Sequence, residues 1–335
     1  MAGITGMGDT FDLPNYVGEL FSLTREDTPF LSAIGGLSGG KQTKSTVFPW
    51  TTYDLRDSTA NNVALEGAAA PTAVARVRGN VTNVVEIHHS SVDISYTKQA
   101  ATGQFADVGS AHPEITGVDG SNAVMDESAW QIANELKAMA RDINQSFING
   151  AFQEPTTNGS ERKTRGILEA ITTNVVDAQG YALDDTVAPG NTDVLLDLMQ
   201  LIYDNGGILE SETRLLVTNS TQKRKITSFL KGKAYEQAPP SRNFAGMNVT
   251  AIETDFGKLN IMLEPAMPQD EVLICSMAEL VPVFLLIPNK GFLFVENLAK
   301  TGASDSVQIY GEIGLEYGVE KHHGKIVNLA TVDAS

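Results

Sequence analysis

The feature that most constrains the fold is the β-rich segment 41–98, which has no helix of its own to pack against. A Thr-rich stretch ending near Tyr53 predicts one strand, and a second strand returns after the small and polar residues 57–72. A shift in side-chain parity near Ser90 and Ser91 predicts a β-bulge in the returning chain. Because an isolated two-stranded ribbon is marginally stable in water, we expect contacts outside its own fold to stabilise it. The segment therefore indicates a protein that assembles.

One long amphipathic helix is predicted over residues 126–153. Apolar side chains recur there every three or four residues, Asp126 is a suitable N-cap, and Pro155 ends the pattern. At about 1.5 Å per residue the helix would span about 40 Å, which is longer than a typical globular helix.

The N-terminal segment 1–40 has apolar residues at helical spacing but forms no lobe of its own. Glycines at 35, 36, 39 and 40 interrupt it before the β-rich segment begins. Since such a segment cannot bury its apolar side alone, we expect it to lie on the body of the protein or on another subunit.

The C-terminal half mixes helices and strands, which predicts the α+β class. Helices are expected over 192–206 and from Ser220 to about Leu230, with a strand from Arg214 to Val217 between them. Short strands are expected from Asn248 to Val295.

The end of the chain carries the clearest strand pattern. Alternate residues from Val307 to Val319 are apolar, with polar residues between them. A turn is predicted at residues 322–325, and residues 326–332 are predicted to return antiparallel to the first strand.

The composition excludes several classes of protein. The chain has 335 residues and one cysteine, Cys275, so neither an intrachain disulfide nor a multi-cysteine metal site can form. Cys275 lies in an apolar run, and we expect a buried, inert thiol. The start of the chain lacks a signal-peptide pattern, and no uncharged apolar run approaches about 18 residues, so we expect neither secretion nor a transmembrane helix.

The net charge of −17 is unevenly distributed: residues 41–98 carry +1 and the rest of the chain carries −18. An acidic body argues against general nucleic-acid binding, which needs clustered lysine and arginine. The distribution favours self-association, with a near-neutral ribbon on acidic neighbours, although an acidic surface that only aids solubility is an equal alternative.

Several short motifs suggest chemistry that their context does not support. The string from Gly35 to Lys41 fits a phosphate-binding loop, but Gln42 replaces the required hydroxyl, and a strand follows where a helix is needed. Asp255-Phe-Gly257 matches a kinase metal-binding triplet without the other kinase motifs, so a tight turn is expected. Neighbouring residues on a strand point to opposite faces, so neither His88-His89 nor His322-His323 is expected to chelate a metal. We predict no catalytic, cofactor-binding or metal-binding residues.

The stretch from Ile252 to Pro268 carries the most specific family signal. Its turn Glu253-Thr-Asp-Phe-Gly257, its loop Pro265-Ala-Met-Pro268 and the segment Thr28-Pro-Phe-Leu-Ser-Ala-Ile34 resemble the major capsid proteins of tailed phages of the Hong Kong 97 type. The resemblance implies an α+β Hong Kong 97-like capsid fold with five parts. These are an N-terminal arm 1–40, an extended β-hairpin loop 41–98, a peripheral domain 99–190 with a spine helix 126–153, an axial domain 191–300, and a return to the peripheral-domain sheet at 301–335.

The resemblance also implies a function: a non-enzymatic major capsid protein that self-assembles into an icosahedral phage head around double-stranded DNA. Implied partners are identical copies in hexamers and pentamers, portal and scaffolding proteins, decoration proteins, and packaged DNA without sequence specificity, with no membrane. The protein would belong to the virion and be assembled in the host cytoplasm. Many relatives carry a long N-terminal scaffolding segment that is cleaved after assembly, whereas only about 25 residues precede Thr28 here. Either this chain uses a separate scaffolding protein or it is already processed, and the initiating Met1 favours the former.

We expect two groups of side chains to pack between subunits. Those of the ribbon are Phe48, Trp50, Tyr53, Val85 and Ile87, and those of the arm are Phe11, Leu20, Phe21 and Phe30. The basic stretch 220–235 is expected to be a solvated helix face, with contact to an acidic neighbour or to packaged DNA as the alternative.

Two other functions stay open at this point. An encapsulin-type nanocompartment would have the same architecture but enclose a cargo enzyme. A soluble enzyme or ligand-binding protein would instead be a compact monomer or dimer with a ligand pocket.

Overall fold

The computed structural model describes residues 26–55, 58, 62–98, 127–157, 159–181, 183, 194–207, 214–233, 251–300 and 302–331. The chain divides into two compact units, each of which gathers segments distant in the sequence. Unit 1 comprises Met1–Asp27, His89–Met139 and Val295–Ile309, and unit 2 comprises Thr28–His88, Ala140–Phe294 and Tyr310–Ser335. Helices and sheets are mixed, which confirms the α+β prediction.

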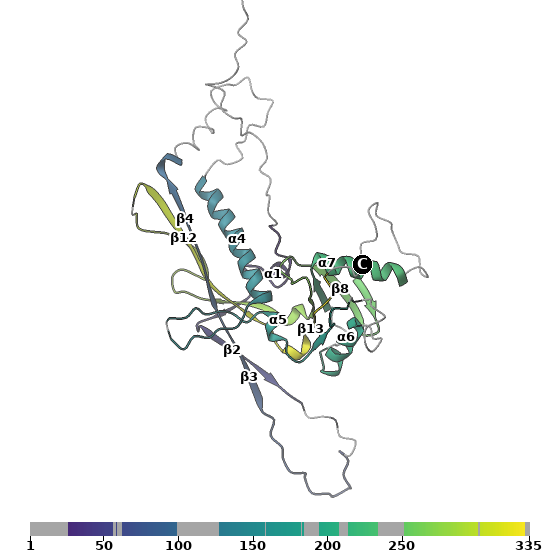
Figure 1. Ribbon diagram of the computed structural model, residues 1–335. Helices are drawn as coiled ribbons and strands as arrows, with labels where there is room; N and C mark the ends of the chain where they lie inside the picture. Colours follow the sequence, from purple (N-terminus) through teal and green to yellow (C-terminus); the bar gives the residue numbers. More distant parts are fainter. Residues whose placement is uncertain are drawn as a thin grey trace, which may run out of the picture. The chain divides into compact units, whose positions relative to one another are not determined.

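Unit 1 packs the first half of helix α4 (Glu127–Asn149) beside parts of strands β4 (Glu86–Ser95) and β12 (Ser304–Glu316), as Figure 1 shows. The Ser90 hydroxyl on β4 donates to the Glu135 carboxylate on α4 at 2.8 Å. The Ser306 hydroxyl on β12 donates to Asp93 on β4 at 3.0 Å. Polar side chains therefore tie the helix and the two strands together.

Helix α4 confirms the long helix but ends at Asn149 instead of residue 153. Gly150 follows it, and a Cβ there would lie 2.3 Å from the Ser146 carbonyl oxygen and 2.5 Å from that of Thr164. The chain can therefore turn at this point only without a side chain. Gly166 donates its N–H to the Gly150 carbonyl at 2.8 Å and leads into the short helix α5 (Ile167–Ala170).

A five-stranded sheet has the order β1-β10-β12-β11, and β4 also pairs with β12. The further strands are β1 (Lys41–Thr43), β10 (Val281–Leu285) and β11 (Leu293–Asn297). β1 runs parallel to β10, and β10 runs antiparallel to β12. The predicted apolar side of the C-terminal strand is confirmed at five residues that are buried, whereas Val319, beyond the end of β12, is half-buried: the five are Val307, Ile309, Ile313, Leu315 and Tyr317.

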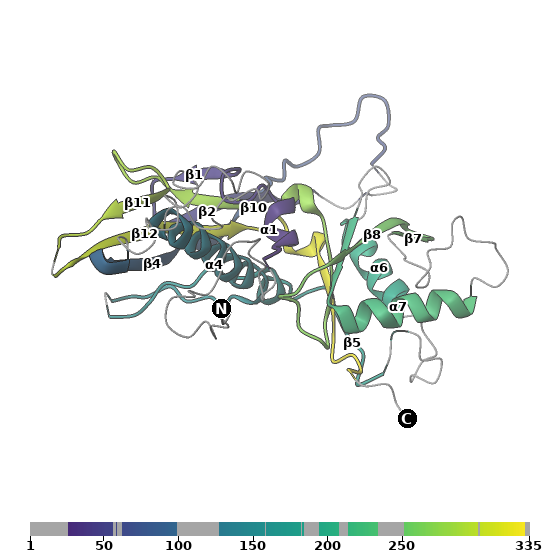
Figure 2. The same ribbon diagram turned by 90° about the horizontal axis from the view of Figure 1, so that it is seen from above.

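In unit 2 a six-stranded sheet has the order β5-β13-β9-β6-β8-β7. Its strands are β5 (Val175–Asp177), β6 (Arg214–Thr218), β7 (Ala251–Thr254), β8 (Gly257–Leu263), β9 (Val272–Cys275) and β13 (Gly324–Val327). Helices α6 (Val194–Asp204) and α7 (Ser220–Lys233) lie against it (Figure 2) and share one apolar cluster with it. The cluster includes Leu198, Ile202, Leu216, Ile226, Val272, Ile274 and Ile326.

The predicted antiparallel return of residues 326–332 onto the C-terminal strand is wrong. β13 pairs with β9 and β5 in the six-stranded sheet, whereas β12 belongs to the five-stranded one. β10 in turn lies before residue 301 and pairs with β12. Strands from both sides of residue 301 therefore belong to the five-stranded sheet.

The predicted ribbon is present as β2 (Val47–Tyr53) paired antiparallel with β3 (Arg78–Val84). The predicted bulge at Ser90 and Ser91 is wrong, because β4 keeps a single inward parity through His88, Val92 and Ile94. The parity shift falls earlier, where Val84 and Val85 are both fully buried.

Asn83 explains this break between β3 and β4. Its side-chain oxygen accepts the N–H groups of Val84 and Arg165, each at 2.9 Å. Its amide nitrogen donates to the carbonyls of Leu315 at 2.7 Å and Arg165 at 3.1 Å. One fully buried amide thus satisfies backbone groups from three segments, which is what a strand break in a protein interior requires.

Glu264 performs a similar role for helix α1 (Pro29–Ala33). Its two side-chain oxygens accept the Phe30 N–H at 2.9 Å, the Asn144 side-chain amide at 2.8 Å and the Ala266 N–H at 3.1 Å. The Asn144 oxygen in turn accepts the Leu31 N–H at 2.9 Å. Both polar side chains are buried, so α1 is held to α4 and to the loop after β8.

His323 fixes the crossing of the chain from β12 to β13, which follows the short 3-10 helix η4 (Glu320–His322). Its Nε2–H donates to the Tyr317 carbonyl at 2.8 Å, and its Nδ1 accepts the Ser276 N–H at 3.3 Å. The Arg214 guanidinium donates to the His322 carbonyl at 2.6 Å. Burial lowers the pKa of His323 to about 4, so the fold holds the neutral ring.

Replacing Glu264 by alanine should lower the free energy of unfolding by about 3 kcal/mol, because three buried donors lose their acceptor. Glu264→Gln keeps one acceptor oxygen and should lose about half as much. Urea unfolding of the unassembled chain measures both values. A loss below about 0.5 kcal/mol for Glu264→Ala would contradict the role assigned to this carboxylate.

His323 should make the folded chain sensitive to mild acid. Above pH 6.5 its ring is neutral in the folded and the unfolded chain, and as the pH falls to about 4 only the unfolded chain binds the proton. This difference should remove about 3 kcal/mol of stability across that range. His323→Gln should flatten this part of the pH profile of urea unfolding. The matched variant His89→Gln, at an exposed position, should leave it unchanged.

Candidate assembly surface

The loop that joins β2 to β3 carries apolar side chains that its own chain does not cover. Figure 1 shows the two strands running side by side into this open loop. The six side chains in question are each at least 75% exposed: Tyr53, Leu55, Val63, Leu65, Val74 and Val77. An exposed apolar group of this extent marks an interaction site in a folded protein.

Three of the predicted packing residues belong instead to the core of their own chain. Phe30 and Val85 are fully buried and Phe48 is 5% exposed, so they have almost no surface to give to a neighbouring subunit. Phe30 lies at the start of α1, and Phe48 and Val85 pack against Val283 on β10. An apolar pattern in a strand or in the arm predicts that the side chains are buried. It does not show whether their own chain or a neighbouring subunit buries them.

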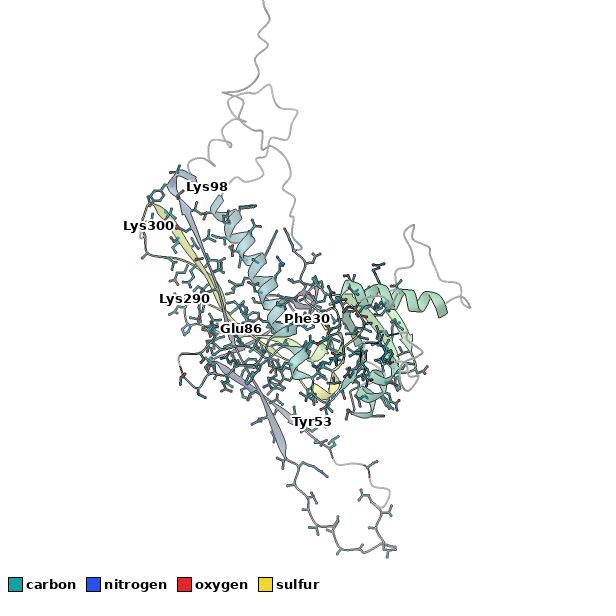
Figure 3. The ribbon with its side chains drawn as sticks, viewed as in Figure 1. Phe30, Tyr53, Glu86, Lys98, Lys290 and Lys300 are labelled. Atoms are coloured by element: carbon teal, nitrogen blue, oxygen red, sulfur yellow. The ribbon has the colours of Figure 1, made fainter. Side chains whose placement is uncertain are left out.

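The other predicted residues fall into two groups. Tyr53 and Ile87 are exposed and Trp50 is half-buried, so these three remain candidates for contact with another subunit. Figure 3 shows Tyr53 near the end of the paired strands, before the open loop. Phe11, Leu20 and Phe21 lie outside the described residues.

The root of the ribbon is fastened to the five-stranded sheet through Phe48. Its ring fits because residue 314 is a glycine: a Cβ there would lie 2.7 Å from the ring and 2.7 Å from the Val84 carbonyl oxygen. Trp50 and Leu285 pack against the same small cluster. The root is therefore part of the subunit core.

Trp50 forms a second fastening two residues further along β2. Its indole N–H donates to the Gly318 carbonyl at 2.7 Å, and its ring meets the Tyr317 ring edge-to-face at 4.9 Å. The remaining face of Trp50 borders a shallow groove. Its lining is Pro49, Trp50, Thr51, Thr52, Asn80, Ala278, Glu279, Glu316, Gly318 and Val319.

Two carboxylates line this groove, and both are paired. Lys41 forms an ion pair with Glu316 at 2.7 Å. Glu279, in the 3-10 helix η3 (Met277–Glu279), accepts the Val319 N–H at 3.1 Å and pairs with Nδ1 of His322 at 2.5 Å. Burial alone would raise the pKa of Glu279, but the contacts with His322 and Val319 hold it below its ordinary value. The groove thus presents no unpaired charge from these two residues to a reactant.

The motifs with a chemical resemblance have structural roles. Gly257, with φ of 116°, makes the tight turn between β7 and β8, as predicted for Asp255-Phe-Gly257. His88 points inward on β4 while His89 is exposed, as strand alternation requires. Cys275 is fully buried, and burial raises the pKa of its thiol to about 12, in agreement with an inert thiol.

Within the described ranges, no three or more histidine, cysteine, aspartate or glutamate residues are placed to hold a metal ion. None of the helices among those ranges is long and apolar enough to span a bilayer.

Sequence reasoning did not identify Asn83, Glu264, Glu279 or Gly318. Each acts on a partner that is distant in the chain, such as Asn83 on Leu315 or Glu264 on Phe30. Spacing patterns report local periodicity, so they carry no signal for these contacts. Only Gly318 had a local cue, because glycine after a strand often marks a change of direction, and its φ is 61°.

The chain is similar along nearly its entire length to capsid proteins. It matches the SU10 major capsid protein family over residues 3–330. No curated protein matches it significantly in sequence.

Among solved structures, it is similar to the capsid of a native GTA particle (TM-score 0.60, 13% identity, 98% of this chain and 99% of the other). It is also similar to the capsid of cyanophage A-1(L) (TM-score 0.62, 9% identity, 95% and 97%). The SrpI encapsulin of Synechococcus elongatus shares the arrangement as well (TM-score 0.54, 10% identity, 97% and 94%).

At these identities the structural likenesses speak for the fold, and they confirm the predicted Hong Kong 97-like capsid fold. The family match extends that agreement to the role of the chain, because its members are structural capsid subunits and not enzymes. A subunit with a fastened ribbon root and an uncovered apolar loop fits that role. The chain belongs to the SU10 major capsid protein family and is a structural capsid protein.

Proposed function

We propose that copies of this chain assemble into a closed icosahedral shell around double-stranded DNA, and that the loop 54–77 of each copy docks on a neighbour. The observation that carries the proposal is the contrast along one ribbon. Its root is buried through Phe48, whereas the end of β2 and the loop leave six apolar side chains exposed, one at Tyr53 and five within residues 54–77. Family membership supports the capsid role, and the shell geometry and the docking are our inference.

Burial of the loop would supply the driving force. Fully burying a valine or leucine side chain gains about 1.5–3 kcal/mol, and the loop offers several. Ordering the loop and fixing two copies in place offsets part of that gain, so a single contact is weak. In a closed shell of hexamers and pentamers every copy makes the contact at once, and closure multiplies its effect.

Charge favours the same arrangement. The segment 41–98 carries +1 on a chain of net charge −17, and its exposed residues include Arg76 and Arg78. Two acidic bodies repel each other, so a near-neutral ribbon is the part of the chain best suited to lie across a neighbour. We expect assembly to be favoured by added salt to the extent that this repulsion is screened.

Further contacts and partners belong to the same proposal. Trp50, Tyr53 and Ile87 are the described residues proposed to meet a neighbour, with Phe11, Leu20 and Phe21 of the arm as additional candidates. A portal, a separate scaffolding protein and decoration proteins are the proposed partners. The proposed place of assembly is the host cytoplasm, and the product is the virion.

The likeness to SrpI supports a second candidate with the same architecture, an encapsulin-type shell. The two candidates differ in what the particle contains. Electron microscopy with nucleic-acid staining of purified particles distinguishes DNA-filled heads from shells that enclose a cargo enzyme. A compact monomer or dimer that forms no particle would contradict both.

Deleting residues 57–72 should leave a soluble chain that no longer assembles, because the deletion removes the docking loop and spares the buried root. The measurement is particle yield by sedimentation and electron microscopy, with circular dichroism to confirm folding. Particle yield equal to that of the parent chain would refute docking through the loop.

A pair of substitutions tests the apolar contact without shortening the loop. Val63→Ser with Leu65→Ser removes two exposed apolar side chains and should weaken each subunit contact by about 3 kcal/mol, or more than about 100-fold in its equilibrium constant. The matched control is Ala68→Ser with Ala69→Ser, which changes two small exposed residues of the same loop. The control should assemble like the parent chain.

A further inference from the structure

The turn Tyr317-Gly318-Val319 is held from two sides. On the ribbon side, its Gly318 carbonyl accepts the indole N–H of Trp50. On the other side, the Val319 N–H donates to Glu279, and the Tyr317 carbonyl accepts the N–H of the His323 ring. The turn is therefore the only described backbone segment that contacts both the Trp50 indole and the Glu279 carboxylate by hydrogen bonds.

The Glu279 side chain lies directly against Gly318 in this turn. A Cβ at Gly318 would lie 2.5 Å from Oε2 of Glu279 and 2.8 Å from its Cβ. The other oxygen of Glu279 is paired with His322. Glu279 therefore contacts the turn directly through Gly318 and Val319 and contacts His322 through its other oxygen.

We propose that Glu279 is a positioning residue for the ribbon: acting through the Gly318 turn, it fixes the seat of Trp50 and hence the direction in which the loop 54–77 leaves the subunit. The effect on Trp50 is a property of the single chain. The effect on assembly rests on the function proposed above.

A small shift of Trp50 produces a larger displacement at the end of the ribbon. Phe48 and Trp50 are the two points at which β2 is fastened, and they lie about 7 Å apart along the strand, whereas Tyr53 is about 16 Å from Phe48. A shift of about 1 Å at Trp50 then displaces the end of the paired strands by more than about 2 Å, and the loop beyond by more. A docking contact between subunits does not tolerate such a displacement.

Several titratable or charged groups lie around Glu279. His322 is its direct partner, His323 and Arg214 face the same buried junction, and Glu316 lines the groove while paired with Lys41. Protonation of Glu279 removes the negative charge that faces His322 and the Val319 N–H, so the contacts that hold the turn should weaken in acid. Glu279→Gln removes this dependence and keeps an oxygen for the Val319 N–H.

The test uses the two tryptophans of the chain. In a Trp130→Phe background, Trp50 is the only indole, and its emission reports the seat. We expect Glu279→Ala to shift this emission to longer wavelength and to increase its quenching by acrylamide. Glu279→Gln should retain the emission of the parent at neutral pH.

Gly318→Ala should reproduce the effect of Glu279→Ala, because the new methyl group displaces the carboxylate from the opposite side. The matched control is Gly291→Ala. Gly291 also has a positive φ, 94°, but a Cβ there meets nothing within 4 Å. The control has the same kind of backbone cost and should leave Trp50 emission unchanged.

Particle yield completes the experiment. Glu279→Ala and Gly318→Ala should lower the yield about tenfold or more, because every contact in the shell weakens together, while Glu279→Gln and Gly291→Ala assemble. If Glu279→Ala lowers the melting temperature but leaves Trp50 emission as in the parent, Glu279 is only a stabilising residue and the proposal is overturned.

If the emission shifts and particles form at the parental yield, the positioning of the ribbon for assembly is overturned. Failure of the parent chain itself to form particles overturns the proposed function. In that case the Trp50 emission still tests whether Glu279 fixes the position of the Trp50 side chain.

Discussion

The structure depends on a simple requirement: backbone groups left unpaired where a strand or helix ends inside the protein must find a partner. Three buried side chains meet it. Asn83 satisfies four backbone groups at the break between β3 and β4, Glu264 accepts the Phe30 N–H at the start of α1, and His323 bridges Tyr317 and Ser276 where the chain changes sheets. Each joins segments that are more than 40 residues apart, so these side chains couple distant parts of unit 2.

This requirement explains why the ribbon has two different halves. Near its root, Phe48 and Asn83 are covered by β10, β12 and the residues around Arg165, and the polar groups there are paired. In the described part of the loop 54–77, no other segment covers the chain in this way, and its apolar side chains face solvent. One end of the ribbon is thus packed into the subunit core, and the other end exposes an apolar surface. Such a surface is expected in a protein that is stabilised partly by contacts with other subunits.

Much of the fold could be predicted from local periodicity. The long helix, the pair α6 and α7, the ribbon strands and the apolar side of β12 all have regular spacing, and the structure contains them. What could not be predicted depends on contacts between distant residues. Val85 and Ile87 have the same parity in the sequence, yet Val85 is fully buried and Ile87 is exposed, because the chain breaks at Val85 between β3 and β4 and the inward parity changes there. Likewise, nothing local in residues 322–327 shows that β13 joins β9 and not β12. For the candidate surface, the alternation of apolar residues identified the ribbon. It did not show which aromatic side chains of the ribbon are buried within the same chain.

The absence of a side chain at position 314 has a consequence for how this family diverges. The Phe48 ring occupies the space where a Cβ of residue 314 would lie, and the Val84 carbonyl closes the other side. An alanine at 314 therefore requires both a smaller residue at 48 and a shift of the Val84 backbone, and loss of the Phe48 ring would weaken the packing of the ribbon root against β10. Substitutions at positions 48 and 314 should therefore be correlated among related capsid proteins.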